Sequence, residues 1–131
     1  AHNYGGIKAI VNSVSNIYHD FIIVYGCGGD RDSSEREKIM KFACTNSREV
    51  IFTSDNCRNE SFQSILDDSR KDQEYSNLIV EPDRKQAIKN GIDALKEDEI
   101  LLILGKGHEE FQEIKGTKIP FNDQRVVEEI L

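Results

Sequence analysis

Three short apolar runs, each followed by a polar loop, constrain the fold of this chain more than any other feature. The runs are Phe21–Tyr25, Val50–Thr53 and Ile100–Leu104. Continuous apolar runs of this length, rich in β-branched residues, are typical of strands that are buried on both faces. Segments with apolar residues at helical spacing alternate with them, at residues 5–18, 34–45, 60–70 and 82–95. The alternation predicts an α/β fold with a Rossmann-like, doubly wound and mostly parallel sheet.

Smaller elements complete the prediction. Shorter apolar runs predict three further strands, at Asn77–Val80, Phe111–Ile114 and Lys118–Phe121. The last two flank Lys115-Gly116-Thr117, so we expect them to form an antiparallel hairpin at the edge of the sheet. Asn122 is expected to cap a last helix. Asp123 and Arg125 are expected to be surface or helix-start residues, and a supporting role in a site is the less favoured alternative.

Length and composition exclude several classes of protein. With 131 residues the chain is expected to be one domain, residues 1–131. The net charge of -7 argues against nucleic acid as a partner, and no apolar stretch approaches the length of a transmembrane helix. The three cysteines form no Cys-x-x-Cys pair, which favours a reducing, cytoplasmic compartment. The chain starts at Ala1 without an initiator Met, so we expect it to be a fragment of a longer protein.

The three polar loops are the candidate site. They are residues 26–32, 54–59 and 105–110, and each follows one of the three apolar runs. In a parallel sheet these loops leave the same edge, and ligands bind beyond the carboxyl ends of the strands. We therefore expect the loops to converge on one ligand.

The first loop, Gly26-Cys27-Gly28-Gly29-Asp30-Arg31-Asp32, matches neither the dinucleotide fingerprint nor the Walker A pattern. Arg31 is suited to pair with a carboxylate or a phosphate. Asp30 and Asp32 are suited to hold Arg31 or to bind a ligand ammonium. A tight turn with a surface salt bridge is the alternative.

The other two loops carry complementary charges. In the second loop, Asp55, Asn56 and Arg58 match the ammonium and carboxylate of an amino acid, and an Asx turn or helix cap is the alternative. Cys57 is expected to be unreactive, although the adjacent arginine could lower its pKa. The third loop adds two candidate partners for an anion and one for an ammonium: Lys106, His108 and Glu109. Ordinary surface residues are the alternative there, and no metal site is predicted because His108 has no partner cluster at ligand spacing.

Taken in order, the segments Gly-Cys-Gly-Gly-Asp-Arg-Asp, Thr-Ser-Asp-Asn-Cys-Arg-Asn-Glu and Gly-Lys-Gly-His-Glu-Glu-Phe-Gln resemble the C-terminal domain of the Mur ligase family. The resemblance covers nearly the whole chain and is closest to the members that add diaminopimelate. It implies an ATP-dependent ligase of bacterial peptidoglycan synthesis that joins meso-diaminopimelate to UDP-MurNAc-L-Ala-D-Glu. It also implies that the full-length enzyme uses ATP and Mg²⁺, that this domain binds neither tightly alone, and that the UDP-binding and central ATPase domains are absent from this chain.

The resemblance assigns roles to individual residues. It implies a meso-diaminopimelate pocket made of Arg31, Asp55, Asn56, Cys57, Arg58, Gly105 and Glu109, with possible support from Asp30, Asp32, Lys106 and His108. Arg58 is implied to clamp the carboxylate that diaminopimelate has and lysine lacks. Cys57 stands where the family usually has Pro, so the shape of this loop is the open point. No catalytic residue is expected, and the chain alone is expected to be inactive. A stand-alone amino-acid-binding module is the alternative.

Overall fold

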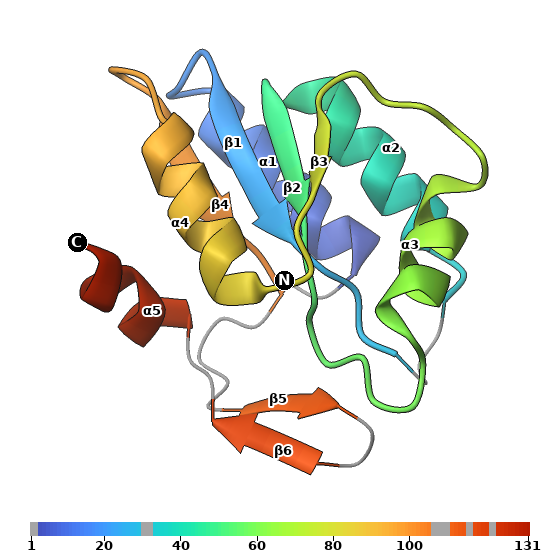
Figure 1. The fold of residues 1–131 in the computed structure, drawn as a ribbon. Helices are drawn as coiled ribbons and strands as arrows, with labels where there is room; N and C mark the ends of the chain where they lie inside the picture. The colour runs from blue at the N-terminus through green and yellow to red at the C-terminus, as the bar shows by residue number, and fades with distance from the viewer. Residues whose placement is uncertain (1–2, 30–32, 106–110, 115–116, 121–122) are drawn as a thin grey trace.

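The three apolar runs and the short run at 78–80 form four strands, which pair into one parallel sheet (Figure 1). The computed structural model describes residues 3–29, 33–105, 111–114, 117–120 and 123–131. Its strands are β1 Phe21–Tyr25, β2 Glu49–Phe52, β3 Leu78–Val80, β4 Ile100–Ile103, β5 Phe111–Ile114 and β6 Thr117–Pro120. Its helices are α1 Tyr4–Ser15, α2 Arg36–Asn46, α3 Phe62–Arg70, α4 Arg84–Ala94 and α5 Asp123–Ile130.

The strand order places a switch point beside β1. The sheet runs β3-β2-β1-β4, and Ile23 of β1 aligns with Val50 of β2 and with Leu102 of β4. The chain moves outward from β1 through β2 to β3 and then crosses to β4 on the other side. This is the order of the first four strands of the dinucleotide-binding fold, in which ligands bind where the winding reverses. The prediction of a Rossmann-like parallel sheet is confirmed.

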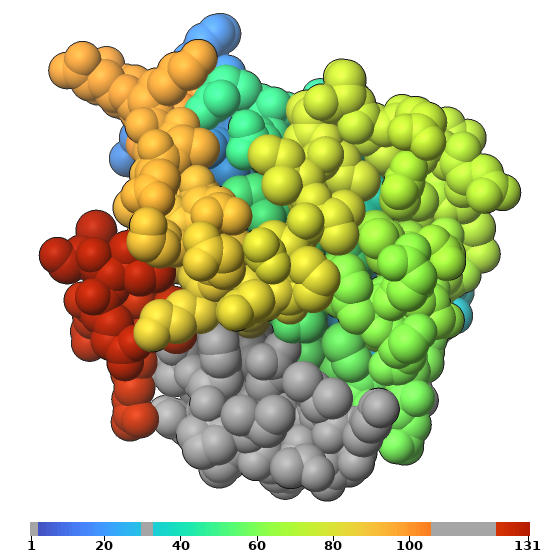
Figure 2. Space-filling view, viewed as in Figure 1, coloured from blue at the N-terminus to red at the C-terminus, as the bar shows by residue number. Residues whose placement is uncertain are grey.

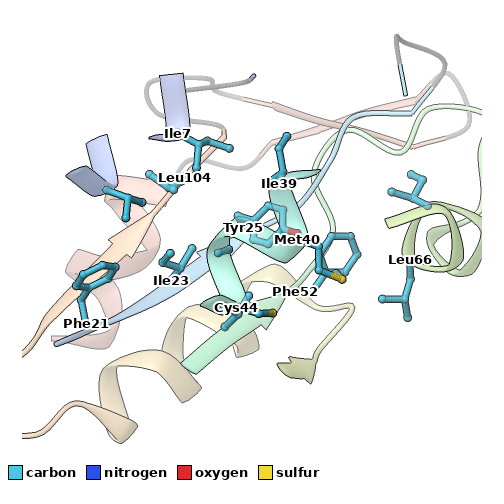
Figure 3. Packing of buried hydrophobic residues seen from close by; sticks show 14 of the residues in the cluster. Ile7, Phe21, Ile23, Tyr25, Ile39, Met40, Cys44, Phe52, Leu66 and Leu104 are labelled. Carbon is cyan, nitrogen blue, oxygen red and sulfur yellow. The ribbon is translucent and has the colours of Figure 1, made fainter. Parts of the chain in front are cut away.

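Helices cover both faces of the sheet, so the fold is doubly wound (Figure 1). Successive side chains of β1 point to opposite faces. Phe21, Ile23 and Tyr25 join the larger core with residues of α1, α2 and α3, many of which are labelled in Figure 3. Ile22 and Val24 join a second core with residues of α4 and α5. All five β1 residues are at most 2% exposed, which explains why the run is apolar throughout.

Side-chain caps set where three of the helices begin. The side chain of Asn3 accepts a hydrogen bond from the Gly6 amide, and that of Ser61 accepts one from the Ser64 amide. Asp83 accepts from two amides in the first turn of α4. Such caps satisfy amides that have no partner within the helix. Because Ser61 is the cap, α3 begins at Phe62 rather than at residue 60 as predicted.

The predicted hairpin is present and antiparallel, with Phe111 of β5 opposite Pro120 of β6. Its two strands form a sheet of their own instead of extending the edge of the main sheet. A strand pattern predicts that a segment pairs but not with which partner, and here the two strands pair with each other. None of the helices in the described ranges is long and apolar enough to cross a membrane.

Candidate functional site

The first and second loops are in direct backbone contact. The amide of Gly29 donates a hydrogen bond to the carbonyl of Asn56 over 2.6 Å. A Cβ atom at Gly29 would overlap the Cys57 carbonyl oxygen, and one at Gly26 would overlap the Thr53 carbonyl oxygen. Neither glycine has a φ in the left-handed region, so the close approach of the neighbouring chain is what requires glycine here.

The third loop meets the other two at Asp55. Gly105 has a φ of 110°, and a Cβ atom there would lie 2.7 Å from Oδ2 of Asp55 and 3.8 Å from the Gly26 carbonyl oxygen. The carboxyl ends of β1, β2 and β4 therefore bring Gly26, Asp55 and Gly105 together. The predicted convergence of the three loops is confirmed for the part of them that the structure describes.

Asp55 and Asn56 are buried, at 5% and 8% exposure. The Asn56 amide donates to Oδ1 of Asp55 over 2.8 Å, while Oδ2 lies against Gly105. This bond comes from the amide of the next residue and not from the amide two residues on, so it is not the Asx turn that we gave as the alternative. It orients the carboxylate toward the third loop. A carboxylate held in this way is chemically suited to accept hydrogen bonds from an ammonium group.

Arg58 links the first two loops. Its backbone is left-handed, with a φ of 53°, a conformation that non-glycine residues adopt rarely. Its Nη1 donates to the carbonyl of Gly29 over 3.1 Å and to the carbonyl of Asn56 over 3.2 Å. These bonds orient the planar guanidinium, the group best suited to pair with a carboxylate in two-point fashion.

Cys57 is 5% exposed and packs into the larger core. Burial raises the pKa of its thiol, so the structure does not support a pKa lowered by the adjacent arginine. The Cys57 carbonyl accepts from the Glu60 amide over 3.0 Å, which closes the second loop into a turn.

Sequence reasoning missed a buried arginine behind the first loop. Arg36 is 4% exposed, and its Nη2 donates to the Gly28 carbonyl over 2.9 Å. Its two terminal nitrogens also pair with the Glu60 carboxylate, over 2.9 and 3.1 Å, and Nη1 reaches Asp68 over 3.3 Å. Hydrogen bonding to Glu60 raises the pKa of Arg36 further above its already high ordinary value. Arg36 therefore ties the first loop to the end of the second.

A second buried arginine was also missed. Arg84 begins α4 and is 1% exposed, and its guanidinium pairs with both carboxylate oxygens of Asp123, over 2.7 and 2.8 Å. Asp123 was predicted to be a surface or helix-start residue. It does begin α5, but it is not a surface residue, because it is only 6% exposed. Each arginine begins a helix directly after a loop, where a cation opposes the helix dipole and needs compensating partners. The predicted helices began two residues earlier, at residues 34 and 82, so the sequence did not reveal this position.

Six candidate residues lie outside the described residues: Asp30, Arg31, Asp32, Lys106, His108 and Glu109. Their predicted roles stay predictions. Within the described ranges, no group of three or more histidine, cysteine or acidic side chains is arranged to hold a metal ion.

Comparison with known proteins agrees with this architecture. Residues 1–107 match the family described as Mur ligase, glutamate ligase domain. A UDP-N-acetylmuramoyl-L-alanyl-D-glutamate–2,6-diaminopimelate ligase from Aquifex aeolicus (strain VF5) is 42% identical, over 100% of this chain and 28% of the relative. A ligase of the same name from Helicobacter pylori (strain J99 / ATCC 700824) is 42% identical, over 98% of this chain and 29% of the relative.

A solved structure of a ligase with the same name has the same fold. It superposes with a TM-score of 0.93 at 32% identity, over 99% of this chain and 27% of that one. This chain thus spans about 28% of the length of the curated relatives that it matches. The matched family, the similarity over the whole chain and the shared fold lead to one conclusion: the chain belongs to the Mur ligase family.

Proposed function

We propose that this chain is the C-terminal, amino-acid-binding domain of an ATP-dependent ligase that adds meso-diaminopimelate to UDP-MurNAc-L-Ala-D-Glu. The observation that carries the proposal is the meeting of three loops that brings Asp55, Arg58 and Gly105 to the switch point of the sheet. The relatives named above support it, because their printed names specify 2,6-diaminopimelate. Their length supports a domain of a larger enzyme, since the chain covers 28% of the Aquifex relative.

The proposed reaction forms an amide bond. ATP, with Mg²⁺, supplies activation of the dipeptide carboxylate as an acyl phosphate. The amine nitrogen of diaminopimelate then bonds to the acyl carbon, the carbon–oxygen bond to phosphate breaks, inorganic phosphate leaves, and the amine releases a proton. The contribution of this domain is to position the amine, which lowers the entropic part of the barrier.

The pocket residues divide this work by charge. In this proposal Asp55 and Glu109 bind the ammonium groups of meso-diaminopimelate, and Arg31 and Arg58 bind its carboxylates. The contacts of Arg58 with Gly29 and Asn56 preorganise its guanidinium before the ligand arrives. Lysine has no carboxylate at the far end of its side chain, so it would leave Arg58 without a carboxylate partner from the ligand, and the loss of such a two-point contact is costly.

Other parts of the proposal lie outside this chain. We place the UDP-MurNAc-dipeptide and ATP on the UDP-binding and ATPase domains of the longer enzyme, and Mg²⁺ with the phosphates of ATP. We place the enzyme in the bacterial cytoplasm, in agreement with three free cysteines in the described residues and with bacterial relatives.

The test is amino-acid selectivity in the full-length protein that contains this chain. Phosphate release is measured with meso-diaminopimelate and with L-lysine, for the wild type and for Arg58→Ala. The wild type is expected to use diaminopimelate, and Arg58→Ala is expected to lower its kcat/KM preference over lysine by about 10²-fold or more. Arg70→Ala is the matched control, because Arg70 ends α3 and its guanidinium bonds to Gln73 and Glu74 in the segment that follows.

Two results would contradict the proposal. A wild-type enzyme without diaminopimelate-dependent phosphate release would refute the function, and an intact preference in Arg58→Ala would refute the specificity role. The isolated 131-residue chain serves as a further arm. The isolated chain is expected to release no phosphate. If it binds diaminopimelate while the full-length protein has no ligase activity, the result would favour the stand-alone binding module.

A further inference from the structure

A single buried guanidinium connects two of the three pocket loops. Beyond its ion pair with Asp123, Arg84 donates from Nη1 to the Ser54 carbonyl over 3.0 Å and from Nη2 to the Leu104 carbonyl over 3.1 Å. Ser54 is the residue before Asp55, and Leu104 is the residue before Gly105. The group therefore reaches the backbone directly behind two residues of the proposed pocket.

The two carbonyl groups lie just beyond the ends of two different strands. Ser54 follows β2 and Leu104 follows β4, and these strands are separated by β1 in the sheet. No ladder hydrogen bond joins strands that are not neighbours, so the spacing of Asp55 and Gly105 depends on other contacts. The fork geometry of one guanidinium bridges the gap and fixes the two carbonyls relative to each other.

The pairing with Asp123 makes this bridge possible. Arg84 is at the first position of α4, where the helix dipole disfavours a cation, and it is buried. Asp123 is in the first turn of α5, where a carboxylate is favoured. The helices α4 and α5 lie side by side, as the yellow and red segments of Figure 2 show. Asp123 thus compensates a charge that would otherwise be costly at this place.

We propose that Arg84, with Asp123 as its counter-charge, is a positioning residue that sets the spacing of Asp55 and Gly105 and thereby the affinity for the amino acid. This inference rests on the function proposed above. It goes beyond it because neither residue belongs to the predicted pocket. Arg84 acts through the backbone of the two loops and not by touching the substrate.

A purely structural arginine elsewhere in the fold provides the matched control. Arg48 pairs with both oxygens of Glu99, over 2.6 and 2.8 Å, and donates to the Ala94 carbonyl over 2.9 Å. Its chemistry is like that of Arg84. Arg48 precedes β2, however, and so lies at the amino end of the sheet, opposite the loops. A change at Arg48 removes comparable bonds without touching the pocket.

The experiment measures KM for each substrate in the full-length ligase, for the wild type, Arg84→Lys, Asp123→Asn and Arg48→Lys. Circular dichroism identifies a temperature at which each variant is folded. Arg84→Lys keeps the charge but loses the fork, and Asp123→Asn keeps the shape of the partner and serves if Arg84→Lys does not fold. We expect both to raise KM for meso-diaminopimelate about tenfold or more, with KM for ATP within about twofold of wild type. Arg48→Lys is expected to lower the melting temperature and leave both KM values unchanged.

Other outcomes separate the two proposals. If the wild type uses diaminopimelate but the folded Arg84 and Asp123 variants keep its KM, the positioning role is refuted and the function stands. A parallel rise of KM for ATP and diaminopimelate, or an equal rise in Arg48→Lys, would also refute the positioning role, because it would show a general loss of structure. A wild type that does not use diaminopimelate refutes the proposed function, and the positioning role falls with it.

Discussion

At the scale of single residues, Gly29 and Gly5 show that glycine can be required by its neighbours or merely tolerated. Gly29 is buried where two loops touch, and a Cβ there would overlap the Cys57 carbonyl oxygen and come within 3.2 Å of Glu60 Cβ. Gly5 is exposed in the first turn of α1, and the nearest atom to a Cβ there is 3.7 Å away. The two positions therefore predict opposite effects of the same substitution.

Gly29→Ala is expected to lower the free energy of unfolding by about 2 kcal/mol or more, because the added methyl group must push the backbone of one loop away from the other. Gly5→Ala, the matched control, is expected to raise it by about 0.5 kcal/mol, because alanine has the higher helix propensity. Urea denaturation of both variants measures the difference. Equal effects of the two substitutions would show that the loops do not touch as described.

Asp55, Asn56 and Arg58 could be proposed from the sequence because their chemistry is local, with acceptors and a donor inside the four consecutive positions 55–58 that follow an apolar run. Their orientation could not. The bond from Arg58 to Gly29 joins residues 29 positions apart, and that from Arg84 to Asp123 joins residues 39 positions apart. Nothing in a local pattern pairs such residues, so neither the orientation of Arg58 nor the buried pair of Arg84 and Asp123 was predicted.

At the scale of elements, the helix that follows the first loop also holds that loop in place. Arg36 begins α2 and bonds to Gly28 behind it and to Glu60 across from it. The side chains of its two acidic partners, Glu60 and Asp68, are 28% and 27% exposed, so solvent screens part of the attraction. Among the described residues, these two carboxylates are the acidic partners of the buried guanidinium, and they compensate its charge.

Arg36→Met is expected to lower the free energy of unfolding by about 2 to 3 kcal/mol, because it leaves the Gly28 carbonyl and the Glu60 carboxylate without this donor. Lys71→Gln is the control, because it removes the exposed partner of Asp68 on α3 and is expected to change stability little. Thermal unfolding of the two variants compares them. A loss in Lys71→Gln as large as that in Arg36→Met would contradict the importance of the buried clamp.

The observed bounds of a strand or helix agree with the predicted ones where a single physical feature, such as complete burial, decides them. β1 spans Phe21–Tyr25 as predicted, because the whole apolar run is buried. The hairpin was predicted from its turn, but its separation from the main sheet was not, because the pattern of a strand does not say which strand it pairs with.

At the scale of the whole molecule, two acidic groups make stability depend on pH. The hydrogen bond from Arg48 lowers the pKa of Glu99 below its ordinary value of 4.5, and the hydrogen bond from Lys71 lowers the pKa of Asp68 below 3.8. A carboxyl group whose pKa is lower in the folded state stabilises the fold above its unfolded pKa. That contribution is lost as the pH falls through the folded pKa.

The free energy of unfolding is therefore expected to fall between about pH 5 and pH 3, and to fall less steeply in Glu99→Gln. Glu128→Gln is the control, since Glu128 is exposed on α5. Urea denaturation at a series of pH values gives both slopes. A slope in Glu99→Gln equal to that of the wild type would contradict the contribution of this ion pair.

The contacts of Arg58 have a consequence for how the proposed ligase could change its amino-acid substrate. The side chain that is proposed to select diaminopimelate also joins the first loop to the second, through Gly29 and Asn56. Selectivity and loop geometry are thus coupled in one residue. A lineage that replaced this arginine to accept another amino acid would also loosen its own pocket, so a shift in preference calls for a second, compensating substitution between the two loops.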